Sequence, residues 1–393
     1  MKKFITSESV TEGHPDKICD KISDKILDTA LEQDKNSKMA VECTIKDDFI
    51  LIYGECTTNA KLNYEKIAKE VLKDIGYQEE FKIMTKVSNQ SKEINKAVCK
   101  EKIAAGDQGI MFGYASNETK EYMPLPILLA NKLTKQLAIQ RKQDKNSPLL
   151  PDGKSQVTVE YEDNIPKRID TIIIASQHKE GINQKDLEDY IKTNIINKVI
   201  PKKYIDKNTN VLINTSGSFI VGGPFADSGT TGRKIVVDSY GGSAKVGGGC
   251  FSSKDPTKVD RSAAYYARYV AKNIVANNLC DRCEIGVSYA IGKQEPIHIN
   301  IETYNTNKVP LEKIYTFVED NFNFNVDNII IELDLQKPIY YNIASYGHFG
   351  RTELNLPWEK IKRIQNWILL KWHFKIFVSN HFHHFFHFFK LTK

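Results

Sequence analysis

The sequence predicts an α+β protein of three similar domains, because the order helix, β-hairpin, helix occurs three times along the chain. Two patterns carry this prediction. Apolar residues recur at helical spacing on both sides of each hairpin, and each hairpin is a pair of β-rich runs separated by turn residues. The three copies are spaced roughly 110 to 130 residues apart. A chain of 393 residues is long enough to give two or three domains a well-buried core.

The first copy begins at Pro15 with an amphipathic helix. Its apolar residues lie four positions apart, at Ile18, Ile22, Ile26 and Ala30. Two β-rich runs, 41–45 and 49–53, lie on either side of an Asp-Asp turn and predict a hairpin. A second helix then closes the copy, and its buried face is made by Ile67, Val71 and Leu72.

The second copy opens with a helix after Pro126 that runs to about Gln140. The hairpin that follows spans 155–175 and turns near an Asp-Asn pair, which is a typical turn sequence. A helix over 184–199 closes this copy.

The third copy opens with a long Ala-rich helix. We expect this helix to begin at Pro256 with Asp255 as its N-cap, because aspartate is a favoured cap and proline a favoured first residue. The runs 284–290 and 296–304 predict the third hairpin, and a helix over 311–322 closes the copy.

These elements place the expected domain boundaries. We expect an N-terminal domain over 1–100, a central domain over 103–219 and a C-terminal domain over 220–360. The segment 86–106 is polar, rich in small residues and poorly periodic, so we interpret it as a mobile lid loop. Residues 361–393 form a tail that is basic and rich in aromatic residues and histidine.

The net charge of +6 raises the question of nucleic-acid binding, and its distribution answers it. No acidic residue follows Glu359, whereas the tail carries the basic residues Lys362, Arg363, Lys371, Lys375, Lys390 and Lys393. Because the charges of the remaining chain balance, the excess belongs to the tail and we expect no nucleic-acid partner.

The cellular compartment is indicated by what the sequence lacks. The first residues contain no apolar core of a signal peptide, and no run of about 18 apolar residues could span a membrane. The 7 cysteines are scattered, and only Cys280 and Cys283 form a CxxC pair, whereas a zinc ribbon needs two. We therefore expect a cytoplasmic protein with reduced cysteines and no membrane partner.

One glycine-rich run, GGGCFSSKDPTKVD, surrounds the start of the third long helix with Lys254, Lys258 and Asp260. A helix N-terminus favours anions through its free N–H groups, and glycines let a backbone approach a ligand closely. The run is not a Walker A loop, because its lysine lacks the GxxxxGK[ST] spacing. At this point phosphate binding and a plain flexible turn before a helix both stay open.

The start of the first helix has the same design. His14 takes the cap position, Pro15 opens the helix, and Asp16 and Lys17 lie in the first turn. Two helix N-termini that each carry an aspartate and a lysine can together meet a phosphate chain and its magnesium. His14 can donate to a leaving phosphate oxygen, and the alternative is a plain capping histidine.

Two further glycine-rich segments carry polar and aromatic side chains. In SGSFIVGGPFADSGTTGRKIVVDSYGG, Phe219 can cover a flat ring, although it can equally be strand core. Asp227, Arg233 and Lys234 in the same segment can recognise polar groups and phosphate. In AGDQGIMFGY, Asp107 lies between glycines.

Several catalytic motifs are absent from the sequence. It contains no GxSxG, no HExxH and no GxGxxG between a strand and a helix, which disfavours hydrolase triads, zincins and Rossmann cofactors. The residues by themselves therefore indicate an enzyme that uses a nucleoside triphosphate and a divalent metal without a P-loop.

Five ordered motifs make the sequence recognisable. They are GHPDK, GDQGIMFGYASNET, DGKSQVT, GGP followed by DSGTTGRKIVVDSYGG, and GGGCFSSKDPTKVDRSAAYYARYVAKNIV. Together with CEIGVSYAIG and ASYGHFGR, they closely resemble the S-adenosylmethionine synthetase family, also called the methionine adenosyltransferases. The resemblance runs from about Phe4 to Glu359.

This resemblance implies three domains related by pseudo-threefold symmetry, and a homodimer or dimer of dimers with active sites between subunits. It also implies a reaction between ATP and L-methionine. The methionine sulfur attacks the ribose 5′ carbon in line, S-adenosylmethionine forms, and the triphosphate that leaves is hydrolysed to phosphate and diphosphate. A thioether needs no general base, so catalysis would rest on positioning and charge neutralisation.

The resemblance further implies roles for individual residues. It implies catalytic roles for His14, Lys154, Arg233 and Lys254. It implies ATP contacts for His14, Asp152, Gly153, Lys154, Ser218, Phe219, Asp227, Arg233, Lys234, Cys250 and Lys254. It implies methionine contacts for Glu55, Gln90, Asp107, Asp227 and Lys258. Two magnesium ions are expected, with Asp16 and Asp260 as their acids, and one potassium ion is expected at Glu42.

Some features depart from the family pattern. Ser218 stands where the family often has a basic residue, Cys250 replaces the usual alanine, and the lid is shorter than in many members. We interpret the tail beyond Glu359 as a divergent end without a catalytic role; the alternatives are a histidine metal site or an amphipathic helix there. These departures leave a second function open, a catalytically weak regulatory partner subunit of such an enzyme.

Overall fold

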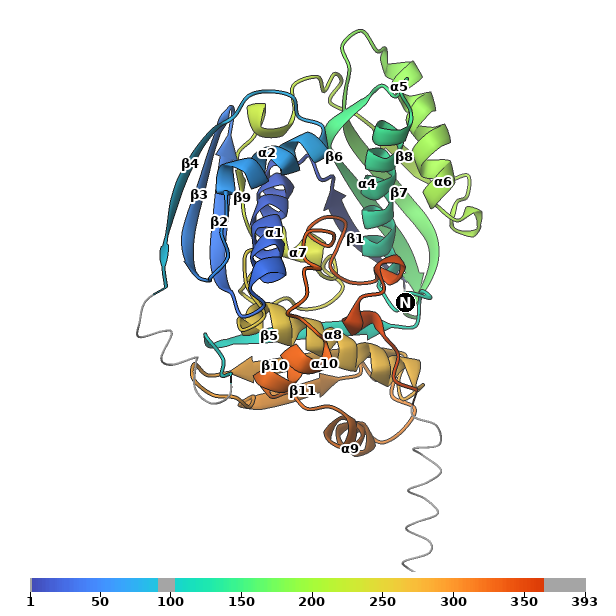
Figure 1. The fold of residues 1–393 in the computed structure, drawn as a ribbon. Coiled ribbons are helices and arrows are strands. Elements are labelled where there is room, and N and C mark those ends of the chain that lie inside the picture. Colours follow the sequence, from blue (N-terminus) through green and yellow to red (C-terminus); the bar gives the residue numbers. More distant parts are fainter. Residues whose placement is uncertain (1, 91–102, 364–393) are drawn as a thin grey trace, which may run out of the picture. The chain divides into compact units, whose positions relative to one another are not determined.

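Three β-sheets with helices packed against them form the framework of the chain (Figure 1). The computed structural model describes residues 2–90 and 103–363. Each of the three predicted hairpins is present, and each lies in a different sheet. The predicted α+β class is therefore confirmed.

The N-terminal hairpin lies at the centre of a sheet with the order β4-β3-β2-β9. β2 (Lys38–Lys46) and β3 (Phe49–Thr57) are antiparallel, and the turn between them contains Asp47 with a positive φ of 50°. β4 (Lys82–Asn89) runs parallel to β3, and the short β9 (Gly229–Thr230) pairs with β2. Every second residue of β2 is buried, as expected of a strand with one face on the core.

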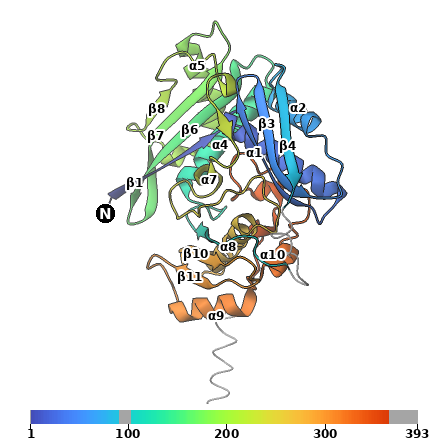
Figure 2. The same cartoon turned by 90° about the vertical axis from the view of Figure 1, so that its left-hand side faces the viewer.

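The central hairpin consists of β6 (Leu149–Glu162) and β7 (Ile165–His178), and it turns at the Asp-Asn pair that the sequence indicated. β1 (Lys2–Val10) runs antiparallel to β6, and β8 (Asn210–Ile213) runs parallel to β7. The sheet order is β1-β6-β7-β8. β1 is therefore an edge strand of this sheet, and it lies next to the N-terminus (Figure 2).

The third sheet has the order β11-β10-β5. β10 (Arg282–Tyr289) and β11 (His298–Glu302) form the predicted C-terminal hairpin. β5 (Gly109–Ser116) runs antiparallel to β10 over its whole length.

The three sheets exchange strands in a cycle. β1 comes from the beginning of the chain but completes the sheet of the central hairpin, and β5 precedes that hairpin but completes the C-terminal sheet. β9, which follows the central hairpin, completes the N-terminal sheet. Each sheet therefore depends on a segment from another third of the chain.

Three long helices cover the sheets. α1 (Pro15–Gln33) packs on β2, α4 (Leu125–Gln143) packs on β6 and β1, and α8 (Val259–Ala276) packs on β5 and β10 (Figure 1). α1 begins where the sequence predicted, whereas α4 begins at Leu125, two residues before its predicted start after Pro126. The prediction for α8 is wrong by three residues, because its N-cap is Lys258 and not Asp255.

The displaced start of α8 has a physical reason. The Asp255 carboxylate accepts hydrogen bonds from the backbone N–H of Met39 at 2.7 Å and of Thr257 at 2.9 Å. Since this side chain is occupied by β2 and by its own turn, residues 255–258 form a turn and the helix begins after them.

The closing helices of the three copies are also present. They are α2 (Tyr64–Ile75), α5 (Gln184–Ile191) and α9 (Leu311–Asn321). The helix predicted over 184–199 is interrupted, since a π-helical turn at Lys192–Ile196 separates α5 from α6 (Asn197–Val199). Two further short helices were not predicted, α7 (Ile235–Asp238) and α10 (Val326–Glu332).

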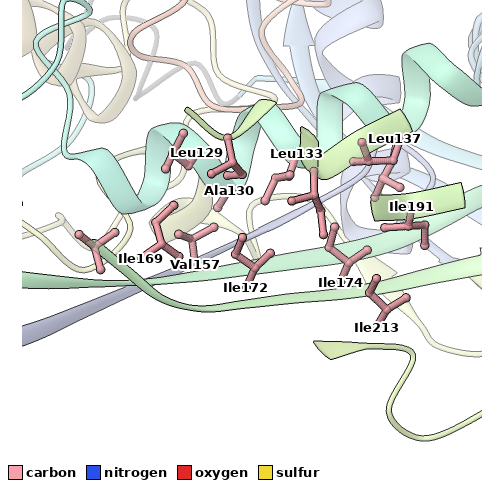
Figure 3. Packing of buried hydrophobic residues seen from close by; sticks show 14 of the residues in the cluster. Leu129, Ala130, Leu133, Leu137, Val157, Ile169, Ile172, Ile174, Ile191 and Ile213 are labelled. Atoms are coloured by element: carbon pink, nitrogen blue, oxygen red, sulfur yellow. The ribbon is translucent and has the colours of Figure 1, made fainter. Parts of the chain in front are cut away.

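One hydrophobic core lies between α4 and the central sheet (Figure 3). Its aliphatic side chains come from α4, from the facing sides of β6, β7 and β8, and from α5. They include Leu129, Leu133, Leu137, Val157, Ile169, Ile172, Ile174, Ile191 and Ile213. Burial of this continuous apolar layer provides the main driving force for forming this part of the fold.

The lid prediction is wrong for residues 86–89, which belong to β4. Residues 91–102 of the predicted lid lie outside the described residues.

The compact unit of the chain ends at Lys360, where buried Glu359 pairs with Arg268 at 2.9 Å and Lys272 at 2.7 Å. The interpretations of the tail fall almost wholly outside the described residues, and within those residues no helix is long and apolar enough to span a membrane.

One buried carboxylate of α1 makes stability depend on pH. Asp28 accepts the backbone N–H groups of Tyr340 at 3.0 Å and Tyr341 at 2.8 Å, and burial raises its pKa to about 7. Because this pKa lies above the ordinary aspartate value, the folded state holds a proton that the unfolded chain has released. The resulting stabilisation is present in acid and is lost as the pH rises through 7.

We therefore expect the wild-type protein to lose about 2 kcal/mol of unfolding free energy between roughly pH 5 and pH 8, relative to Asp28→Asn. Urea unfolding of both proteins across this range measures the difference. Parallel stability curves for the two proteins would contradict the assignment.

Candidate active site

His14 caps α1 and is almost fully buried. Its Nδ1 accepts the backbone N–H of Asp16 at 3.2 Å. Burial, followed by the charge of Lys234, lowers the pKa of His14 to about 3, although Asp16 acts in the opposite direction. The ring is therefore neutral near pH 7, and since Nδ1 is an acceptor its proton lies on Nε2. His14 thus presents a hydrogen-bond donor without carrying charge.

Asp16 binds the segment that carries the predicted phosphate cations. Its carboxylate lies 2.5 Å from Nζ of Lys234 and 3.4 Å from Nε of Arg233, and it accepts the backbone N–H of Thr230 at 2.9 Å. Burial opposes ionisation, but the hydrogen bonds from Lys234 and Thr230 hold the pKa of Asp16 below its ordinary value.

Asp152 and Lys154 come from β6 and belong to the same group. Asp152 is buried, and its Oδ2 accepts the backbone N–H of Gly223 at 2.8 Å, whereas its Oδ1 has no partner among the described residues. Burial raises the pKa of Asp152. The charge of Lys154 lowers the pKa of His14 and the charge of Asp227 raises it, so both side chains lie near the His14 ring.

A second group of predicted site residues surrounds Lys254. Its Nζ lies 2.5 Å from Asp260, and its backbone pairs with Ala40 of β2. Gly249 lies directly against Asp260, since a Cβ at this glycine would stand 2.1 Å from the Asp260 carboxyl carbon. The predicted methionine residue Lys258 pairs with Asp255.

Three further predicted residues, Glu42, Glu55 and Gln90, lie on or directly after strands of the N-terminal sheet. Glu55 of β3 is the register partner of Ala40, which in turn pairs with Lys254. The backbone N–H of Gln90 donates to the residue after Glu55, at 3.3 Å. Glu42 accepts a hydrogen bond from the hydroxyl of Tyr53 at 3.3 Å.

Asp107 and Cys250 lie beside the second group. Asp107 precedes Gly109, whose Cβ position would be 3.7 Å from Asp260. Cys250 is half-buried against Gly232, and burial raises the pKa of its thiol to about 11. At neutral pH this cysteine is therefore a protonated thiol of low reactivity.

The predicted site residues fall into two groups by their contacts, and the groups approach each other where Cys250 packs against Gly232, next to Arg233. The first holds His14, Asp16, Asp152, Gly153, Lys154, Ser218, Phe219, Asp227, Arg233 and Lys234. The second holds Glu42, Glu55, Gln90, Asp107, Cys250, Lys254, Lys258 and Asp260. Across residues 2–90 and 103–363, no hydrogen bond or ion pair joins a side chain of the first group to one of the second.

Two predictions from the residues alone are wrong. Lys17 does not face a ligand, because it is fully buried and pairs with Asp20 at 2.9 Å and with Asp238. Phe219 is not strand core: it lies in a loop, half-buried, and its backbone is held by His178 of β7. Because Phe219 lies in a loop and is only half-buried, its ring is available to a ligand.

One feature of α1 escaped the sequence analysis. The buried residues Asp16, Asp20, Asp24 and Asp28 follow one another at intervals of four, so they lie on one face of the helix. We refer to them as the aspartate row. The spacing is visible in PDKICDKISDKILD, but aspartates on a helix ordinarily indicate a solvent-exposed face.

The described residues contain no group of three or more His, Cys, Asp or Glu side chains that could hold a metal ion by themselves.

Sequence models of three domains of one family match nearly the whole chain. The N-terminal domain of S-adenosylmethionine synthetase matches residues 2–98, its central domain 102–219, and its C-terminal domain 221–360. The chain belongs to the S-adenosylmethionine synthetase family.

Individual members of the S-adenosylmethionine synthetase family agree with this assignment over nearly their full length. The S-adenosylmethionine synthase of Clostridium botulinum is 49% identical over 385 residues, covering 93% of this chain and 98% of the relative. That of Oenococcus oeni is 50% identical over 380 residues, with the same coverage. That of Finegoldia magna is 47% identical over 382 residues, covering 92% and 97%.

The contact between Gly249 and Asp260 gives a matched pair of substitutions. In Gly249→Ala the new methyl group must displace the Asp260 carboxylate from Lys254, whereas a Cβ at Gly248 would meet nothing within 4 Å. We expect Gly249→Ala to lower kcat/KM for ATP by about tenfold or more with little change in Tm, because the displaced atoms are the end of a side chain. Gly248→Ala should keep both values. Equal effects of the two substitutions would contradict this role of the contact.

Proposed function

We propose that this chain is an active methionine adenosyltransferase that forms S-adenosylmethionine from ATP and L-methionine and then hydrolyses the triphosphate. The observation that carries the proposal is that the motif residues occur in a chain whose residues 2–98, 102–219 and 221–360 match the three domains of the family. Nothing in the comparisons supports the alternative of a catalytically weak regulatory subunit. We retain the enzyme as the single candidate.

The chemistry fits a site without a general base. A thioether sulfur is nucleophilic without losing a proton, so the enzyme must align it with the ribose 5′ carbon and stabilise the triphosphate as it leaves. The leaving group carries about four negative charges, which Lys154, Arg233, Lys234 and Lys254 would offset.

His14 would assist the departure of the triphosphate. Its neutral ring offers the Nε2 proton as a hydrogen-bond donor to the oxygen that leaves the 5′ carbon. A neutral donor does not compete with the lysines for the same phosphate charge. The unpartnered Oδ1 of buried Asp152 supports an ATP contact there, since a buried acceptor without a donor is costly until a ligand supplies one.

We propose Mg²⁺ and K⁺ as the metal ions. Asp16 and Asp260 would each give one carboxylate to a magnesium ion, and the phosphate oxygens and water would complete its shell. The ions would neutralise the triphosphate further. Asp16 contacts Lys234 and Asp260 contacts Lys254, and both lysines are predicted phosphate ligands. A bound triphosphate would pair with these lysines and leave the two carboxylates to bind magnesium. Glu42 would bind the potassium ion.

We propose a homo-oligomer, a dimer or a dimer of dimers, whose sites combine the first group of one subunit with the second group of another. Among the described residues, no hydrogen bond or ion pair joins the side chains of the two groups, and this supports the arrangement. A cytoplasmic location is proposed as well, supported by the free thiols of the described cysteines.

The direct test is a product assay. Full-length protein with ATP, methionine, Mg²⁺ and K⁺ should yield S-adenosylmethionine, phosphate and diphosphate, as measured by mass spectrometry and phosphate release. Lys254→Ala is the matched control and should lower kcat by about a hundredfold or more, since it removes a charge from the leaving group. A folded wild-type protein that forms no product would overturn the proposal.

Co-expression of two inactive variants tests the shared site. Lys234→Ala damages the first group and Lys254→Ala damages the second, so a mixed dimer contains one site with both defects and one intact site. We expect random mixing to restore about a quarter of the wild-type activity. No recovery in demonstrably mixed dimers would show that each site is built from a single chain.

A further inference from the structure

The aspartate row of α1 binds loops that are far apart in the sequence. Asp20 accepts the backbone N–H of Gly232 at 2.8 Å, and Asp24 accepts that of Ser253 at 3.1 Å. Both carboxylates are fully buried, and both loops lead directly into the predicted phosphate cations. Gly232 precedes Arg233 and Lys234, and Ser253 precedes Lys254.

The contact at Gly232 is tightly defined. This glycine has a φ of +84°, and a Cβ on it would stand 2.6 Å from Cβ of Cys250, so its backbone can take this path only without a side chain. Thr231, one residue earlier, bonds through its hydroxyl to Ser23 of α1 at 2.9 Å and through its N–H to the carbonyl of Cys43 of β2 at 3.0 Å. The loop is thereby fixed between α1 and the N-terminal sheet.

Lys17 connects Asp20 to the other end of the same loop. Its ammonium group binds Asp20 at 2.9 Å and also binds Asp238, which ends α7. Residues 232–238, including the two phosphate cations, are therefore held at both ends by one buried lysine and two carboxylates. A buried charge triad of this kind is stable only while all its members are paired.

We propose that Asp20 is a positioning residue for the triphosphate, which sets the path of Gly232 and thereby the places of Arg233 and Lys234. Asp20 is fully buried and bonds to Gly232 and Lys17, whereas Asp16, one helical turn earlier, contacts Arg233 and Lys234 themselves. The inference deepens the proposed function and rests on it, because it concerns the cations that meet the leaving group. Since charge stabilisation depends on placement to within a fraction of an ångström, a shifted loop would weaken ATP binding and slow the reaction.

Asp28 provides the matched control. It belongs to the same row, is equally buried, and also accepts backbone N–H groups, but those belong to Tyr340 and Tyr341. Alanine at Asp28 should therefore cost stability as alanine at Asp20 does, without reaching the phosphate cations.

The experiment compares Asp20→Ala, Asp20→Asn and Asp28→Ala in the full-length protein. Asp20→Ala should raise the KM for ATP by about tenfold and leave the KM for methionine within about twofold, because only the phosphate cations shift. Asp20→Asn keeps an acceptor for Gly232 and should show a smaller rise. Asp28→Ala should leave both KM values unchanged.

Amide hydrogen exchange gives a readout that needs no activity. Asp20→Ala should accelerate exchange in peptides covering 229–234 and spare those covering 340–341, and Asp28→Ala should do the reverse. If Asp20→Ala does not fold, Asp20→Asn decides the matter by the same two measurements. An unchanged KM for ATP in a folded Asp20 variant, or uniform acceleration of exchange, would overturn the positioning role. A wild-type protein without product would instead overturn the proposed function, and the exchange experiment would still report on the loop.

Discussion

Helix α1 carries four carboxylates into the interior of the protein, and a buried charge must be paired or hydrogen-bonded to be tolerated. The pairing partners are supplied by loops from distant parts of the chain. Asp16 and Asp20 bind the 229–234 loop, Asp24 binds Ser253 and Arg261, and Asp28 binds Tyr340 and Tyr341. The need to pair these buried carboxylates therefore also brings the cation-bearing loops to α1. The contacts that stabilise the helix are the same contacts that assemble the candidate site.

The local elements could be predicted because their signals are local. Turn residues located each hairpin, and four-residue apolar spacing located the long helices. β1, β4, β5, β8 and β9 escaped prediction, since each is defined by pairing with a strand that is not its neighbour in a hairpin. The start of α8 was misplaced for a related reason: Asp255 is an ideal cap by local rules, but Met39 of β2 occupies its carboxylate.

The candidate site likewise has features that the sequence predicted and features that it did not. The motifs predicted which residues belong to it; some of these contact one another around His14 and others around Lys254, while their roles stay predictions. Which of these residues contact one another could not be read from the sequence, because the spacing of motifs along a chain carries no information about contacts in space. The role proposed for Asp20 was equally hidden. Its spacing relative to Asp16 was visible, but its partner Gly232 lies more than two hundred positions away.

The cyclic exchange of strands has a consequence for synthesis of the chain. β5 (Gly109–Ser116) leaves the ribosome long before β10 (Arg282–Tyr289), the one strand that pairs with it among the described residues. At about 5–20 residues per second, β5 waits on the order of ten seconds or more with its backbone N–H and C=O groups unpaired. The N-terminal sheet likewise stays incomplete until β9 emerges. The nascent protein thus exposes unpaired strand edges that invite aggregation for much of its translation. Its three sheets are completed one after another, and the third is completed last, once β11 (His298–Glu302) has emerged.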